Sequence, residues 1–312
     1  MIWSGFFSYL IVLFRYLKNI CYLCPMNKNF ENWRIFTLNV GKSVSNGDWN
    51  WSHVRSPFAR IYYVEEGTAE VVIHGESEHT IVLQPGRLYL IPPFTEHTDR
   101  CSGHFVHYYI HVYEEPHGDN FLDDMDFPYD LEARDVDVAL FKLLAELNPS
   151  MRLLEYDPKA YDNHSTLQQN LLVNRQRELF NKVESRGILY VLISRFLMEA
   201  RPKSDIKDAR IQEAVQYVKE KITERISIDQ LASVACLSPD HFIRLFKKEV
   251  GETPNMYVNR RKMERAELLL VTTDMTIKEI AGSLDYLEPA YFNRVFTKYV
   301  GISPQRYRLS QR

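Results

Sequence analysis

One pattern occurs twice near the C-terminal end of the chain, and it limits the possible folds more than any other feature of the sequence. The first copy is IDQLASVACLSPDHFIRLFKKEVGETPNMY, residues 228–257, and the second is IKEIAGSLDYLEPAYFNRVFTKYVGISPQRY, residues 277–307. Ile228 and Ile277 are 49 residues apart and Pro239 and Pro289 are 50 apart, so the second copy has one additional residue between its halves. Such a repeat predicts a tandem helix-turn-helix, with units at about 228–250 and 277–300.

The second half of each copy carries the start and stop signals of a short helix. Proline is favoured at the first helical position, and a glycine followed closely by proline is typical of a helix end. Two phenylalanines at spacing i, i+4 supply the apolar stripe by which such a helix packs. Cys236 and Asp285 occupy the turn position where glycine is often found, and an aspartate adopts a left-handed backbone more readily than a cysteine. The residues that carry these signals are Pro239, Phe242, Phe246, Gly251, Pro289, Phe292, Phe296 and Gly301.

The repeat, together with the segment that joins its copies, resembles the DNA-binding domain of AraC-type (arabinose-regulator-like) transcription factors. The resemblance covers about the last hundred residues and implies an all-α domain at 209–312 that binds double-stranded DNA. The segment 255–271 is predicted to form one helix of about 17 residues, ~25 Å long, between the two units. The matching residues are Leu231-Ala232, Ser238-Pro239, Phe246-Lys247-Lys248, Gly251, Pro254, Ala266, Leu269-Leu270, Ile280-Ala281, Tyr291-Phe292-Asn293-Arg294, Phe296, Gly301, Ser303-Pro304 and Tyr307.

Residues off the apolar stripe of the second helix of each unit are predicted to face DNA. Arginine can pair bidentately with guanine and asparagine with adenine, and lysines that follow suit phosphate contacts. A salt bridge within the domain is the alternative role of Arg244 and Arg294. Residues 209–312 carry 17 Lys and Arg against 13 Asp and Glu, a modest excess of the sign that DNA requires. The predicted DNA-binding residues are Asp240, Ile243, Arg244, Lys247, Lys248, Ala290, Asn293, Arg294 and Lys298.

Residues 1–25 differ in composition from the rest of the chain. Their apolar run is interrupted by Arg15 and Lys18, so it is shorter than the ~20 apolar residues that a membrane span needs. Either translation starts at Met26 and this extension is not part of the working protein, or the extension is a membrane anchor. Cys21 and Cys24 have a zinc-like spacing without a second pair, and four cysteines in 312 residues do not indicate a disulfide framework. We therefore expect a reducing compartment, the cytoplasm.

Short alternating runs between residues 36 and 113 predict a small antiparallel barrel or sandwich. Glycine and proline separate these runs, which are ARIYYVEEG, TAEVVIHG, HTIVLQPG, RLYLIPP and HFVHYYIHVY. Gly67, Gln84-Pro85-Gly86, Ile91-Pro92-Pro93 and His97 resemble the cupin-like sensor domain of AraC-type regulators. The predicted fold is multidomain: a cupin-like antiparallel β-barrel with a helical dimerisation segment at 26–200, a linker at 201–208, and the all-α tandem helix-turn-helix.

One strand of the predicted barrel bears a polar aromatic face. His107, Tyr109, His111 and Tyr113 alternate with Val106, Tyr108, Ile110 and Val112. Either the first set lines the interior, where it would suit a small hydroxylated ligand, or the valine-rich set fills the barrel and the histidines meet solvent. His107 and His111 lie ~13 Å apart on a strand and cannot share a metal ion. The resemblance implies His107 and Tyr109 as ligand contacts, and His53, Arg55 and Tyr62 are further candidates.

Helical patterns at 136–147, 167–183 and 187–198 follow the barrel. The last has a wide apolar stripe, for which the resemblance implies dimerisation; burial against its own barrel is the alternative. The sequence as a whole predicts a transcription regulator that a small molecule, a sugar among the candidates, controls. We expect a homodimer that meets RNA polymerase and has no catalytic residues, no cofactor and no metal. The alternative is a cupin-type enzyme with an accessory DNA-binding domain.

Overall fold

The computed structural model describes residues 33–75, 77–115, 121–203 and 206–310 of the 312. The chain divides into two compact units, Met1–Trp33 and Arg34–Arg312, and the second contains the elements below. The predictions for residues 1–25, Cys21 and Cys24 included, lie outside the described residues. In the described part of the chain, no helix has the length and apolar character that a membrane span requires.

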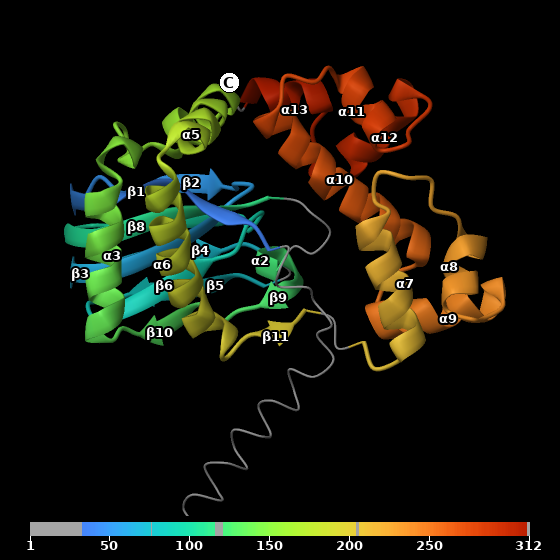
Figure 1. The fold of residues 1–312 in the computed structure, drawn as a ribbon, viewed down its shortest axis with the longest axis horizontal. Helices are drawn as coiled ribbons and strands as arrows, with labels where there is room; N and C mark the ends of the chain where they lie inside the picture. The colour runs from blue at the N-terminus through green and yellow to red at the C-terminus, as the bar shows by residue number, and fades with distance from the viewer. Residues whose placement is uncertain (1–32, 76, 116–120, 204–205, 311–312) are drawn as a thin grey trace, which may run out of the picture. The chain divides into compact units, whose positions relative to one another are not determined.

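The N-terminal part of this unit contains two antiparallel sheets (Figure 1). The larger sheet has the order β1-β8-β3-β6-β10 and the smaller has the order β2-β7-β4-β5. The antiparallel β domain is confirmed, but its described strands form two sheets that do not close into one barrel. The larger sheet consists of β1 Ile35–Asn46, β8 His104–Glu114, β3 Ala59–Gly67, β6 Arg87–Ile91 and β10 Asp130–Glu132, and the smaller of β2 Trp51–Val54, β7 His97–Arg100, β4 Ala69–Ile73 and β5 His79–Leu83.

The five predicted strand runs are confirmed as β3, β4, β5, β6 and β8, while β1 escaped the prediction. β1 has twelve residues and pairs with β8 along its whole length, from Ile35 opposite Glu114 to Asn46 opposite His104. A small additional sheet joins β9, Met125–Asp126, to β11, Arg201–Pro202, so two residues of the predicted linker pair with a strand that follows β8 in the chain.

Helices cover the larger sheet. They are α3 Asp135–Leu147, α5 His164–Gln176 and α6 Leu179–Leu197, with the shorter α2 Phe121–Asp124, α4 Pro158–Tyr161 and the 3-10 turn η2 Pro149–Met151. The predicted boundary between residues 183 and 187 is wrong: the chain breaks earlier, at Arg177 and Glu178, whose backbone is extended, and then continues as one helix. The apolar stripe of α6 is buried, and α6 packs on β1 and α3. The stripe is therefore used for packing within its own chain, which is the alternative given above, and it is not exposed for dimerisation.

The C-terminal part consists of helices, as the repeat predicted. Ser227 and Thr276 close capping boxes at the starts of the corresponding helices α8 and α11, and Gly251 and Gly301 end α9 and α12 in the left-handed conformation. The helices are α7 Ala209–Glu220, α8 Ile228–Val234, α9 Pro239–Val250, α10 Pro254–Thr272, α11 Ile277–Ser283, α12 Pro289–Val300 and α13 Pro304–Ser310.

Two glycines in the β domain allow a test of its packing. Gly67 and Gly86 both have positive φ, +73° and +78°, but a Cβ atom on Gly67 would lie 1.9 Å from the carbonyl oxygen of His104, whereas one on Gly86 would meet nothing within 4 Å. We expect Gly86→Ala to lower the free energy of unfolding by about 1 kcal/mol, the usual left-handed strain. Gly67→Ala adds a backbone clash and should cost about 3 kcal/mol or more. Urea unfolding of both variants checks this; equal losses would contradict the close approach of β3 and β8.

Candidate DNA interface and interior polar cluster

The turn of each helix-turn-helix unit has the predicted left-handed residue. Cys236 has φ +52° and Asp285 has φ +61°. Leu287 lies in the longer second turn, directly before Glu288 and the helix start at Pro289, and is 88% exposed. The inserted residue is therefore accommodated by exposing an apolar side chain rather than by altering the helices.

The predicted DNA-facing side chains lie on the solvent side of α9 and α12, and the four phenylalanines lie on the buried side. Ile243 is half-buried and the other eight predicted residues are exposed. Within the described chain, neither Arg244 nor Arg294 forms a salt bridge with a carboxylate. The guanidinium of Arg294 instead lies 5.8 Å from the ring centroid of Tyr291. Both arginines are thus available for a partner outside the chain, and their predicted role stays a prediction.

Helix α10 joins the two units and packs on α9, α11, α12 and α13. Its 19 residues, against the 17 predicted, span ~28 Å. The buried Lys262 donates from Nζ to the carbonyl oxygens of Glu224, at 3.1 Å, and Leu284, at 2.7 Å. Glu224 precedes the first unit and Leu284 ends the first helix of the second, so one side chain connects both units.

Three of the five predicted ligand residues lie together between the two sheets. Tyr62, His107 and Tyr109 are buried, and the His107 ring lies 5.3 Å from that of Tyr62 and 5.4 Å from that of Trp49. The Tyr109 hydroxyl accepts a hydrogen bond from the amide of Leu153 at 2.8 Å. His107 and His111 are each 2% exposed, so the polar aromatic face turns inward and the histidines do not meet solvent.

The other two predicted ligand residues lie elsewhere. His53 is exposed, and its ring Nδ1 lies 2.7 Å from a carboxylate oxygen of Glu96. The guanidinium of Arg55 donates two hydrogen bonds to the buried carboxylate of Glu267 in α10. Arg55 therefore connects the β domain to the helix that joins the two DNA-binding units.

The sequence prediction missed all but one member, His107, of a group of buried polar side chains in the N-terminal part. This interior polar cluster consists of Arg60, His97, Asp99, His107 and Asp162. Arg60 Nη2 lies 3.4 Å from Asp162 Oδ2, which also accepts from the Ser56 hydroxyl, and His97 Nε2 lies 3.8 Å from Asp99 Oδ1. The signal was weak because His97 and Asp99 belong to β7, a four-residue polar strand, HTDR, that resembles a loop.

Several atoms of the interior polar cluster have no hydrogen-bond partner among the described residues: His97 Nε2, Asp99 Oδ1, His107 Nδ1 and Asp162 Oδ1. Burial raises the pKa of Asp99 to about 7, although the nearby Arg60 opposes this shift. Burial lowers the pKa of His97 and of His107 to about 3. Buried polar groups are almost always hydrogen-bonded, so four such atoms in one interior would suit a polar ligand or ordered water. Among the residues described, no three His, Cys, Asp or Glu side chains could together hold a metal ion.

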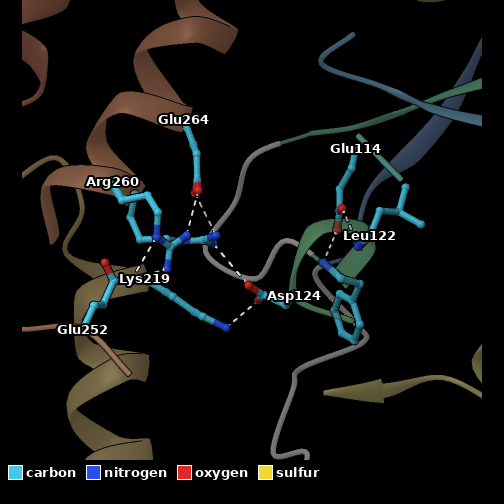
Figure 2. A network of polar contacts seen from close by, with 9 residues as sticks. Glu114, Leu122, Asp124, Lys219, Glu252, Arg260 and Glu264 are labelled. Atoms are coloured by element: carbon cyan, nitrogen blue, oxygen red, sulfur yellow. Dashed lines mark hydrogen bonds and ion pairs between the residues drawn. The ribbon is translucent and has the colours of Figure 1, made fainter. Parts of the chain in front are cut away.

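A second polar network joins α2 to the helical part (Figure 2). Asp124 accepts from Lys219 of α7 and lies 3.3 Å from Arg261 of α10. Arg260 pairs with Glu252 and Glu264, each at 2.8 Å, and Glu114 accepts from the amides of Phe121 and Leu122. Asp124 is thus held by cations from two helices of the C-terminal part.

Comparison with known proteins supports the assignment of the C-terminal part. Residues 231–310 match a family described as a helix-turn-helix domain. The regulatory protein PocR of Salmonella typhimurium is 35% identical over 101 residues, which are 32% of this chain and 33% of that protein. The arabinose operon regulatory protein of Escherichia coli (strain K12) is 32% identical over 102 residues, 32% of this chain and 35% of that protein. The chain therefore spans about a third of the length of either relative.

Among solved structures, the DNA-binding domain of AdpA in complex with a target DNA is 28% identical, covering 32% of this chain and 91% of that one with a TM-score of 0.32. The repeat, the helices that it forms and the curated relatives agree that residues 231–310 form a helix-turn-helix domain similar to part of these regulators.

Proposed function

We propose that this chain is a sequence-specific transcription regulator whose occupancy of DNA is controlled by a small hydroxylated molecule, with sugars among the candidates. The observation that carries the DNA-binding role is the pair of corresponding exposed faces on α9 and α12, each with an arginine that has no salt bridge among the described residues. Base contacts specify the site and lysines position the helices on the phosphates. The protein acts in the cytoplasm as a homodimer and meets RNA polymerase at the promoter.

The effector binds between the two sheets, at the interior polar cluster. Hydroxyl groups both donate and accept, so one sugar-like molecule supplies partners for histidine nitrogens and carboxylate oxygens alike. Tyr62 and Tyr109 add the aromatic surface that suits such a ligand. His53 lies outside this site, and Arg55 serves to transmit the signal rather than to contact the effector.

A short chain of contacts connects the effector site to the DNA-binding units. Arg60 pairs with Asp162, which accepts from Ser56, and the residue directly before Ser56, Arg55, holds Glu267 of α10. An effector that changes the position of Asp162 would act on Ser56 and, through its neighbour, on α10. A ligand shifts the equilibrium only by its difference in affinity for the two states. This contact chain is where that difference would arise.

The DNA-binding role is tested by selection from randomised duplexes with the full-length protein. We expect an enriched motif with two parts about one helical turn apart. Arg244→Ala and Arg294→Ala should each weaken binding to that motif by about 1–3 kcal/mol, roughly 5- to 150-fold, and relax the base preference at one position. Lys248→Ala should weaken binding to every duplex alike and reduce the salt dependence. If no motif is enriched above a salt-sensitive background, the tandem units are not a sequence-specific interface.

The interior polar cluster predicts a pH dependence of stability. Because burial raises the pKa of Asp99 from 3.8 to about 7, the folded state binds more protons than the unfolded state between these values, and the free energy of unfolding falls as pH rises through that window. The Asp99→Asn variant has no carboxyl group to titrate here and so lacks this decrease. The free energy of unfolding of the variant, relative to that of the native protein, should therefore increase from pH 5 to pH 8. Urea unfolding at both pH values measures the difference.

Glu155→Gln, at an exposed position, is the control for the loss of one carboxyl group and should show no such trend. The same Asp99→Asn variant should lose the response to sugars in a screen by thermal shift, because one unpartnered oxygen becomes an amide. A pH-independent difference between native protein and Asp99→Asn would show that Asp99 is not buried as a carboxyl group.

A further inference from the structure

A cavity of about 420 Å³ lies among the ends of β1 and β8, helices α5 and α6, and the C-terminal half of α10. It is separate from the interior polar cluster, none of whose residues lines it. Six cationic residues are among those that line it, against one carboxylate, Glu115. The six are Arg34, Arg175, Arg177, Lys182, Arg186 and Arg265.

Three of these cations are held by neutral groups. Arg177 donates to the side-chain oxygens of Asn174, at 3.3 Å, and Ser185, at 2.7 Å, and to the carbonyl of Asn181. Lys182 Nζ donates to the carbonyl of Arg175 at 2.6 Å, and Arg186 Nε to that of Ile35 at 3.2 Å. In these contacts the side chains are oriented, but their charges are not neutralised. Arg34 is 3.7 Å from Glu115, an ion pair at the exposed edge of the cavity.

The six cations surround one cavity and carry charge of the same sign. Like charges around one concave, partly desolvated surface repel one another more strongly than on an open surface, because the effective dielectric constant is lower. Burial lowers the pKa of Arg177 and of Arg265, although the nearby Tyr113 and Glu115 oppose the shift of Arg265. Guanidinium groups bind carboxylate and phosphate oxygens through two parallel hydrogen bonds. An anion in the cavity would therefore reduce the repulsion and accept from those N–H groups of Arg177 and Arg186 that no described residue binds.

From this geometry we propose that the cavity binds a small organic polyanion with at least two negative charges, a phosphate ester or a polycarboxylate. The carbon frame of such a ligand would contact Phe36, Tyr113, Leu171 and Leu269, which also line the cavity. Arg265 and Leu269 belong to α10, whereas the other cations lie directly before β1, on α5 and α6, or in the turn between these two helices. The anion therefore bridges the β domain and the helix that joins the two DNA-binding units, as a second input beside the interior effector.

The test is titration of the full-length protein with inorganic pyrophosphate and, separately, citrate, at constant ionic strength. We expect saturable binding by calorimetry and an increase in Tm with the concentration of the bound anion, while glucose has neither effect at this cavity. Preference for pyrophosphate indicates a phosphate ester as the natural ligand, and preference for citrate indicates a polycarboxylate.

Lys182→Gln and Arg186→Gln should each weaken binding of the preferred anion at least about tenfold, the loss typical of one charge-assisted contact. Arg177→Gln should weaken it further, but it also removes a contact to buried Ser185, so the two more exposed positions keep the test independent of folding. Lys159→Gln removes one exposed cation outside the cavity and should leave binding unchanged. Equal affinity in all four variants, or no saturable binding, would overturn the proposal.

The six cationic residues of this cavity could instead bind the phosphate backbone of DNA. In that case Lys182→Gln and Arg186→Gln would weaken binding to every duplex and reduce its salt dependence, without saturable binding of pyrophosphate or citrate. That result would also overturn the proposal, and it leaves the roles of Arg244 and Arg294 untouched, since those residues alter base preference.

Discussion

Burial of α10 on several sides is the constraint on which the rest of the described structure depends. Residues on more than one face of this helix are buried, including the charged Arg261, Lys262 and Glu267. Each of these has a partner from another element: Asp124 for Arg261, two carbonyls for Lys262 and Arg55 for Glu267. A buried charge without a partner is strongly destabilising, so the helix is compatible with only a narrow range of positions for its neighbours. The placement of α9 relative to α12 follows from it.

The β domain carries a different constraint, since its interior contains charged and polar groups where apolar side chains would be more stabilising. Replacing a buried ion pair such as Arg60 and Asp162 by apolar residues of similar size is often neutral or favourable to stability. Four polar atoms of the interior polar cluster, which have no hydrogen-bond partner among the described residues, make the arrangement costlier still. A polar interior of this kind is stabilised when a bound ligand supplies the hydrogen bonds that its polar groups need. Stability alone would have favoured the valine-rich pattern on both faces of β8.

The features that sequence predicted well are those with local causes. Each helix-turn-helix unit of about 25 residues contains its own signals: proline at the helix start, the i, i+4 phenylalanines and the final glycine. The positions of the turns at Cys236 and Asp285 could therefore be predicted from the sequence. The break after Gln176 has no proline or glycine to mark it, and β1 lacks strict alternation. Arg55 and Glu267 are 212 residues apart, and the six cations that line the cavity between α5, α6 and α10 come from separate elements. Only the folded chain brings such residues together, so no local pattern could have predicted either site.

Three contacts from outside the helical part converge on α10: Arg55 at Glu267, Asp124 at Arg261, and the cavity between α5, α6 and α10 at Arg265. A ligand that alters any of them acts on the element that sets the distance between the two DNA-facing helices. Coupling between binding sites is reciprocal, so DNA must change the affinity for each ligand by the same factor by which that ligand changes the affinity for DNA. Because one helix receives all three contacts, two chemically different ligands would not act independently: each would alter the response to the other through the same displacement of α10.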